Sequence, residues 1–250
     1  MLREITESTI FPLSSHISIE SFLAQVDVKT SDNIFMGMRF LVLSDVHSSN
    51  RTIAWANRLA REHGADAFIV LGDIVNFSPA DWAEEFLKSL DLPAYAVPGN
   101  CDPPAVVGYI ERAATSLHQR RAEVGGKTFI GLGGSNPTIF DTPFELEEEA
   151  IAEKLGPLME EGAVMVLHCP PYGILDKVRG GKSVGSTAIL DLVKRYRPRV
   201  VLSGHIHEDR GVLENNGTLF MNPGAAKDGF SALLDIGDEI RGVLLDQVIG

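Results

Sequence analysis

Five short apolar segments, each followed at once by residues that commonly bind metals, constrain the fold of this chain most strongly. The segments span residues 40–43, 67–71, 94–97, 164–167 and 200–202. Continuous apolar runs of this length are typical of strands that are buried on both faces of a largely parallel sheet. Ligands of such sheets bind at the carboxyl ends of the strands. We therefore expect the five strand ends to bring four histidines, three aspartates and one asparagine to one edge.

These polar residues form a set of donors that suits transition metals. They are Asp45 and His47; Asp73; Asn100 and Asp102; His168; and His205 and His207. Imidazole and carboxylate donors together favour manganese, iron, zinc or cobalt, whereas an all-oxygen site favours magnesium or calcium. The set is large enough for two divalent metal ions, whose identity the sequence leaves open.

The order of these motifs resembles the calcineurin-like metallophosphoesterase superfamily, which carries D-x-H, G-D, G-N, a lone H and G-H-x-H. The matching segments here are Asp45-Val46-His47, Gly72-Asp73, Gly99-Asn100, His168 and Gly204-His205-Ile206-His207. The resemblance covers roughly residues 38–224. A single motif recurs by chance in unrelated proteins, but five in order, each after a strand-like run, make a specific signal.

The resemblance implies an α/β fold, an α+β sandwich in which two mixed β-sheets pack face to face and helices flank them. It places a dimetal site at the carboxyl ends of the strands. The alternation of strand-like and helix-like segments after residue 38 fits this architecture. We therefore interpret residues 38–250 as a metallophosphoesterase domain, and residues 1–37, which contain no motif, as an N-terminal extension.

Local patterns predict the individual elements. Helices are expected over residues 50–63 with Gly64 after the last turn, from an N-cap at Ser78 to about residue 90, over 145–161 and over 187–197. Hairpin turns are expected at 123–128 and 215–218, and two closing strands near 231–236 and 241–247. The histidines outside the motifs, which are His16, His63 and His118, are expected at the surface or at helix ends.

The resemblance also implies a role for each ligand. Asp45, His47 and His207 would hold one metal ion, and Asn100, His168 and His205 the other. Asp73 would bridge both ions, because a carboxylate can offset the charge of two cations and a neutral imidazole cannot. Such ions lie about 3.5–4 Å apart and acidify a bridging water to hydroxide, which attacks phosphorus in line. Asp73 and Asn100 are thus the expected catalytic residues among the ligands.

One residue departs from the pattern of the protein phosphatases in this superfamily. These enzymes carry a histidine after Gly-Asn that protonates the leaving group, whereas Cys101 stands there in this chain. Gly99-Asn100-Cys101-Asp102 instead resembles small bacterial and archaeal phosphodiesterases. A thiol beside two cations would tend towards thiolate and would be a poor proton donor. We therefore expect substrates with good leaving groups, or a proton that comes from water.

The segment after His168 carries a second resemblance, to animal metallophosphoesterase-domain proteins that cleave cyclic nucleotides. It reads His168-Cys169-Pro170-Pro171-Tyr172-Gly173, and a glycine-rich loop with Arg179 and Lys182 follows. These two cations are candidate substrate-binding residues that could contact a phosphate. The alternative, a solvated loop with two cations, is equally open.

The composition limits the kinds of binding partner and the cellular location that we expect for this chain. The formal net charge is −12, so the chain lacks the basic surface that grips a long nucleic acid, and we expect a small phosphorylated substrate. Two cysteines cannot form a disulfide framework, and no apolar stretch approaches the 18 residues of a membrane-spanning helix. We expect a cytoplasmic protein that does not enter a membrane, and a homo-oligomer is left open.

The sequence thus predicts a metal-dependent phosphoesterase, with a phosphodiesterase acting on small substrates such as cyclic nucleotides as the favoured function. A phosphomonoesterase or a nucleotide pyrophosphatase is the enzymatic alternative, because the metals alone do not select the ester. A catalytically silent scaffold of the same fold is the non-enzymatic alternative. All seven ligands are present, which argues against a scaffold, since scaffolding members usually lose ligands.

Overall fold

The computed structural model of the protein describes residues 37–77 and 79–247. The predicted N-terminal extension, except for Gly37, lies outside the described residues and stays a prediction. Ser78 also lies outside them. None of the helices in the described part of the chain is long and apolar enough to cross a membrane.

Two six-stranded mixed sheets form the centre of the fold, as expected. The first has the order β12 (Ile240–Asp246), β11 (Phe230–Ile236), β1 (Met38–Leu43), β2 (Ala67–Val70), β3 (Ala94–Ala96) and β4 (Thr115–Ser116). The second has the order β5 (Arg120–Val124), β6 (Lys127–Leu132), β7 (Val164–Leu167), β8 (Val200–Leu202), β10 (Thr218–Asn222) and β9 (Gly211–Asn215). Neighbouring strands are parallel from β1 to β4 and from β6 through β7 and β8 to β10. The remaining pairs, which are β1–β11, β11–β12, β5–β6 and β9–β10, are antiparallel.

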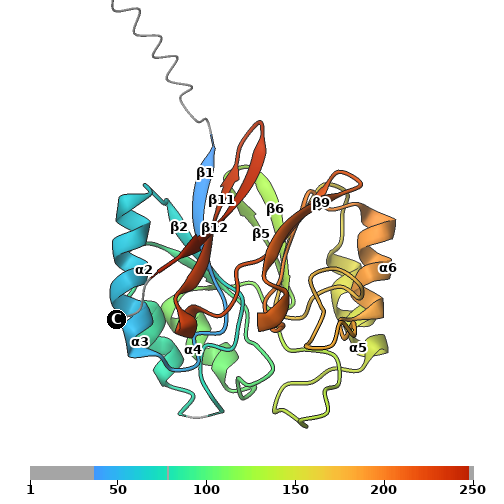
Figure 1. Ribbon diagram of the computed structural model, residues 1–250, viewed down its shortest axis with the longest axis horizontal. Helices are drawn as coiled ribbons and strands as arrows, with labels where there is room; N and C mark the ends of the chain where they lie inside the picture. Colours follow the sequence, from blue (N-terminus) through green and yellow to red (C-terminus); the bar gives the residue numbers. More distant parts are fainter. Residues whose placement is uncertain (1–36, 78, 248–250) are drawn as a thin grey trace, which may run out of the picture. The chain divides into compact units, whose positions relative to one another are not determined.

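Helices cover the outer face of each sheet. On the first sheet lie α2 (Asn50–Glu62), α3 (Trp82–Lys88) and α4 (Val106–Ala113), drawn in blue to green in Figure 1. On the second lie α5 (Glu148–Leu155) and α6 (Thr187–Tyr196), drawn in yellow to orange. Three short 3₁₀ segments span Gly156–Leu158, His207–Asp209 and Ala226–Asp228.

The side chains of a strand alternate between its two faces, so one sheet contributes to two hydrophobic cores. Along β1, Leu41 and Leu43 pack under the helices, while Phe40 and Val42 pack into the layer between the two sheets. Successive side chains of a strand point to opposite faces, so a strand covered on both sides must be apolar throughout. This is why the motif strands read as unbroken apolar runs.

Several local predictions are confirmed by backbone geometry. Gly64, at φ +62°, follows the last turn of helix α2. The backbone N–H of Ala65 donates to the carbonyl of Ala60 at 2.8 Å, as in a Schellman motif. The turn at Gly125 and Gly126 connects β5 to β6, and the turn at residues 216–217 connects β9 to β10. The closing strands β11 and β12 also form where expected.

Three local predictions are corrected. Helix α3 begins only at Trp82, with Asp81 at the N-cap. The acidic helix predicted over 145–161 is limited to Glu148–Leu155, because the carboxylate of Glu145 binds loop residues instead and Gly156 begins a 3₁₀ turn. His118 is buried rather than exposed, because its Nδ1 accepts the backbone N–H of Gly133 inside the fold.

Candidate metal centre

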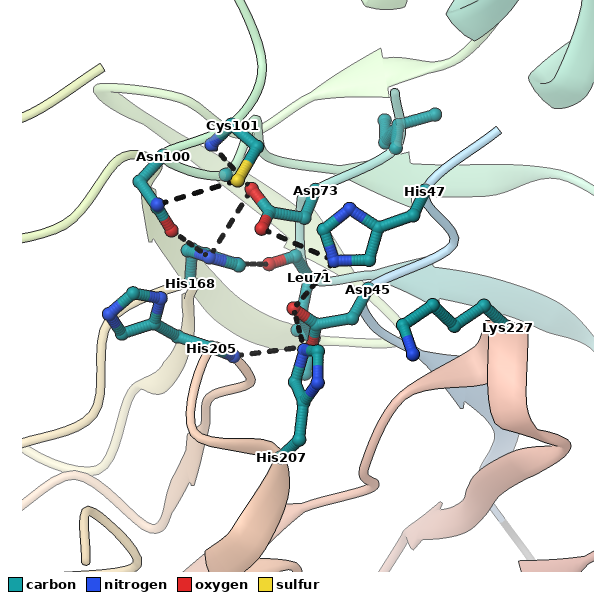
Figure 2. A network of polar contacts seen from close by, with 12 residues as sticks. Asp45, His47, Leu71, Asp73, Asn100, Cys101, His168, His205, His207 and Lys227 are labelled. Carbon is teal, nitrogen blue, oxygen red and sulfur yellow. Dashed lines mark hydrogen bonds and ion pairs between the residues drawn. The ribbon is translucent and has the colours of Figure 1, made fainter. Parts of the chain in front are cut away.

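The seven predicted ligands converge at the carboxyl ends of β1, β2, β3, β7 and β8 (Figure 2). The register explains the convergence, because Leu43 pairs with Val70 and Val70 with Ala96, so the first three strands end side by side. In the other sheet Val166 pairs with Leu202. The loops after these strands therefore open at the same edge.

Asp45, His47 and His207 form one group of donors. His207 Nε2 lies 3.0 Å from Asp45 Oδ1, and His47 Nε2 lies 3.9 Å from the same oxygen. One donor atom from each residue fits within 4.8 Å of the other two. This is the trio that was expected to hold one metal ion.

Asn100, His168 and His205 form the second group. His168 Nε2 lies 2.8 Å from Asn100 Oδ1, and the His205 ring lies 5.1 Å from the His168 ring, centroid to centroid. His168 Nδ1 lies 2.7 Å from the carbonyl oxygen of Leu71, which can only accept a hydrogen bond. The proton is therefore assigned to Nδ1, and Nε2 presents its lone pair towards Asn100.

The carboxylate of Asp73 lies between the two groups. Its Oδ2 is 3.6 Å from His47 Nε2 and its Oδ1 is 3.5 Å from His168 Nε2. The backbone N–H of Cys101 donates to Oδ1 at 2.8 Å. One oxygen of Asp73 thus faces each group, which is the placement that a bridging carboxylate needs.

Four of the seven predicted ligands have left-handed backbone conformations. The φ angles of Asp45, His47, Asp73 and His205 are 55°, 46°, 47° and 66°. Such conformations cost non-glycine residues of order 1–3 kcal/mol each and gather at functional sites. The close packing also explains one motif glycine: a Cβ on Gly99 would lie 2.1 Å from Asp73 Oδ1.

The donors fit divalent cations. Asp45 and Asp73 are 1% and 3% exposed, and among the described residues their side chains form ion pairs only with histidines. His47 Nδ1 is buried without a hydrogen-bond partner among the described residues. Buried carboxylates are costly unless a positive charge compensates them. Oxygen and imidazole donors that converge in this way suit manganese, iron, zinc or cobalt.

The electrostatics of the metal-free site favour the neutral ligand form of His205 and of His47, because burial lowers the pKa of both. Burial lowers the pKa of His205 to about 4, so its imidazole is neutral at pH 7. Burial disfavours the charged form of His207, but the hydrogen bond to Asp45 and the negative charge of that carboxylate together outweigh the effect of burial and raise the pKa. Burial would raise the pKa of Asp45, but the hydrogen bond from His207 and the nearby histidine charges lower it. The Asp45 carboxylate is therefore available as a ligand.

Cys101 lies directly beside the two groups. Its Sγ fits within 4.8 Å of donor atoms on His47 and Asp73, and the Asn100 side-chain amide lies 3.6 Å from it. Burial, followed by the charge of Asp73, raises the pKa of the thiol above its ordinary range, so the thiol is protonated in the metal-free site. The expected thiolate refers to the metal-loaded site and stays a prediction.

Arg179 and Lys182 are not brought to the predicted ligands by any described hydrogen bond or ion pair. Both side chains are exposed on a loop that is closed by a backbone hydrogen bond from Val178 to the carbonyl of Lys182 at 3.0 Å. A role in substrate binding therefore stays a prediction for both.

The sequence assigned no role to Thr142 and Glu145, and it counted Asp102 among the candidate metal donors, whereas the structure gives Asp102 a different role. Asp102 is fully buried and accepts backbone hydrogen bonds from the loops that carry Asp73 and Asn100. Thr142 accepts a hydrogen bond from the Asn100 amide, and Glu145 accepts one from Thr142. The motif Gly-Asn-Cys-Asp pointed to Asp102, but no pattern in the sequence pointed to Thr142 or Glu145.

Comparisons with known proteins agree with this site. The sequence pattern of the calcineurin-like phosphoesterase family matches residues 38–209. An uncharacterized protein of Methanocaldococcus jannaschii is 33% identical over 168 residues, which are 64% of this chain and 77% of that protein. Human metallophosphoesterase domain-containing protein 1 is 36% identical over 76 residues, which are 30% of this chain and 23% of that protein.

A solved structure supports the fold independently. A crystal structure of a Thermus thermophilus protein matches with a TM-score of 0.67 and 19% identity, over 83% of this chain and 98% of that chain. At this identity the match shows the shared fold alone. The sequence match covers more than half of the chain, and its motifs supply the two groups of donors. This chain therefore belongs to the calcineurin-like metallophosphoesterase family.

Proposed function

We propose that this protein hydrolyses phosphate diesters of small molecules, with cyclic nucleotides as the substrate class, and that it uses two divalent metal ions. The observation that carries the proposal is the position of Asp73 between His47 on one side and His168 on the other. Two separate groups of donors that share one carboxylate suit a pair of ions, whereas a single structural ion needs only one group.

Each of the seven predicted ligands has a role in this proposal. Asp45, His47 and His207 would hold one ion, Asn100, His168 and His205 the other, and Asp73 both. Two bound cations would acidify water and neutralise the charge that develops on the phosphoryl oxygens. Leu71 orients His168, and the backbone N–H of Cys101 orients Asp73, so these ligands need not reorganise during the reaction.

The preference for diesters follows from the group at position 101. Beside two bound cations the Cys101 thiol would tend towards thiolate, which has no proton to donate, so leaving groups that need a proton are disfavoured. A monoester also brings two negative charges to a chain of net charge −12, whereas a diester brings one. A cyclic nucleotide carries a single charge and relieves ring strain when it opens.

Exposed aromatic side chains near the site support an organic substrate. The side chain of Phe77 is 50% exposed, and its backbone N–H donates to the carbonyl of Cys101 at 3.1 Å. Phe140 is 78% exposed on the loop whose Thr142 contacts Asn100. Aromatic rings beside a phosphate site can stack on a nucleobase or an aryl group.

The test compares diesters with monoesters at one fixed manganese concentration. Bis-p-nitrophenyl phosphate and the 2′,3′- and 3′,5′-cyclic nucleotides should show higher kcat/KM than the matching monoesters. Asp73→Asn, purified in the same way, is the control for contaminating phosphatases. Monoesters that are preferred by about tenfold or more would overturn the diesterase in favour of a phosphatase. Metal-replete protein that hydrolyses no phosphate ester would instead support the scaffold.

A further inference from the structure

A chain of side-chain hydrogen bonds leads from a predicted metal ligand into the loop between β6 and α5. The Asn100 Nδ2 donates to Thr142 Oγ1 at 3.1 Å, and Thr142 Oγ1 donates to Glu145 Oε1 at 2.6 Å. The backbone N–H of Phe144 also donates to the carbonyl of Asn100 at 3.0 Å. This loop is thus attached to Asn100 by both side chain and backbone.

The direction of these bonds is fixed by chemistry. Burial alone would raise the pKa of Glu145, but the hydrogen bonds from Thr138 and Thr142 lower it to about 2, so the carboxylate is ionised at neutral pH and only accepts. A threonine hydroxyl has one proton, and Thr142 uses that proton in its hydrogen bond to Glu145. Thr142 Oγ1 therefore faces Asn100 with a lone pair, and only the NH₂ end of the amide can bind it.

The two orientations of the Asn100 amide have opposite consequences for metal binding. The observed orientation directs Oδ1 at His168 Nε2, 2.8 Å away, so two lone-pair donors converge where a cation would bind. The flipped amide would donate an N–H to the unprotonated Nε2. That hydrogen bond would satisfy both groups without a cation and would compete with metal binding. Nothing in the covalent structure of asparagine prevents the flip, because its oxygen and nitrogen ends have nearly the same shape.

We propose that Thr142 and Glu145 are positioning residues, which hold the Asn100 amide with its oxygen towards the second metal site. The proposal rests on the proposed dimetal centre, but not on any substrate. Thr142 and Glu145 do not contact the donor groups of the other ligands in any described hydrogen bond. They act through Asn100, by making the flipped amide lose its hydrogen bond to Thr142.

The chain offers a matched control for this loop. Thr138 Oγ1 donates to the same oxygen, Glu145 Oε1, at the same 2.6 Å, but it forms no described hydrogen bond with Asn100. Thr142→Val and Thr138→Val therefore each remove one hydroxyl donor from the same carboxylate, and Thr138→Val also removes the acceptor of the Phe140 backbone N–H. Only the first removes the acceptor of the Asn100 amide. Thr142→Ser keeps that acceptor and serves as the conservative rescue.

The experiment is a titration of metal-free full-length protein with Co²⁺, followed by visible absorption and by calorimetry. Wild type should bind two ions. Thr142→Val should keep the first site and bind the second ion about 10–100-fold more weakly, the usual effect of losing a partner that orients a ligand. Thr138→Val and Thr142→Ser should bind both ions with nearly wild-type affinity.

Three outcomes would overturn the proposal. They are a Thr142→Val variant with wild-type affinity at both sites, a Thr138→Val variant that is as impaired as Thr142→Val, and a wild-type protein that binds fewer than two ions. Should Thr142→Val fail to fold, Thr142→Ala removes the same hydroxyl without adding a methyl group and decides the question. A protein that binds two ions but hydrolyses no diester would refute the proposed function and leave this test intact.

Discussion

The carboxylate of Asp102 accepts the backbone N–H of Val75 at 2.7 Å and thereby ties the loop after β2 to the loop after β3. It accepts two further backbone hydrogen bonds, from Ile74 at 3.1 Å and from Gly99 at 2.7 Å. The two loops carry a predicted bridging ligand and a predicted ligand of the second ion. Together with the hydrogen bond from the Cys101 backbone N–H to Asp73, this buried side chain therefore holds the two metal ligands at their distance.

The first prediction concerns this connection. Asp102→Ala leaves three buried backbone N–H groups without an acceptor, and each such group costs about 1–3 kcal/mol. We expect a loss of about 3 kcal/mol or more in the free energy of unfolding of the metal-free protein, measured by urea denaturation. Asp238→Ala, at an exposed aspartate without a described partner, should change stability by less than about 0.5 kcal/mol. Equal stability of the two variants would contradict the structural role of Asp102.

The second prediction separates the bridging ligand from a ligand of one ion. Asp73→Asn should abolish hydrolysis of an aryl phosphodiester more completely than His168→Ala, because Asp73 faces both groups of donors and His168 belongs to one. Steady-state rates and metal content, measured on the same preparations, check the expectation. Similar residual rates in both variants would count against the bridging role.

The third prediction tests the thiol beside the site. Cys101→Ala should leave hydrolysis of p-nitrophenyl diesters nearly unchanged, because that leaving group needs no proton. Cys169→Ala is the matched control, since Cys169 is a buried thiol that binds Asn136 rather than a predicted ligand. A loss of about a hundredfold or more in the Cys101 variant alone would show that the thiol takes part. Cys101→His should improve substrates with poor leaving groups.

The fourth prediction is a pH dependence of stability that is independent of the metal ligands. Burial lowers the pKa of His118 to about 4, against 6.5 for an exposed histidine. The unfolded chain therefore binds the proton more readily, and the stability from neutral His118 is present above pH 6.5 and lost as pH falls towards 4. The loss should reach about 3 kcal/mol.

The control for this dependence compares two histidines. His118→Gln keeps a side-chain acceptor for the Gly133 N–H but cannot titrate, so its free energy of unfolding should fall less steeply between pH 6.5 and 4. His63→Gln, at the end of α2, introduces the same substitution away from Gly133 and serves as the reference. Denaturation of metal-free protein at a series of pH values gives the three slopes. Parallel curves for wild type and His118→Gln would refute the assignment.

Local patterns were sufficient wherever one element determines its own conformation. Apolar runs located the motif strands, and Gly64 and Gly125 located a helix end and a hairpin, because each acts within a few residues. The same patterns failed at Glu145, where helix propensity competes with hydrogen bonds to Thr138 and Thr142 across a loop. They also failed at His118, whose burial depends on its contact with Gly133 in another segment.

The sequence by itself determined which residues stand at the strand ends and in which order, because strand period and motif spacing are local properties of the chain. Only the tertiary structure decided that Asp73 lies between His47 and His168, and that Thr142, 42 residues away from Asn100, contacts its amide. Those relationships depend on strand register and on the packing of loops from two sheets. Such contacts join residues far apart in the chain, and no local pattern encodes their distances.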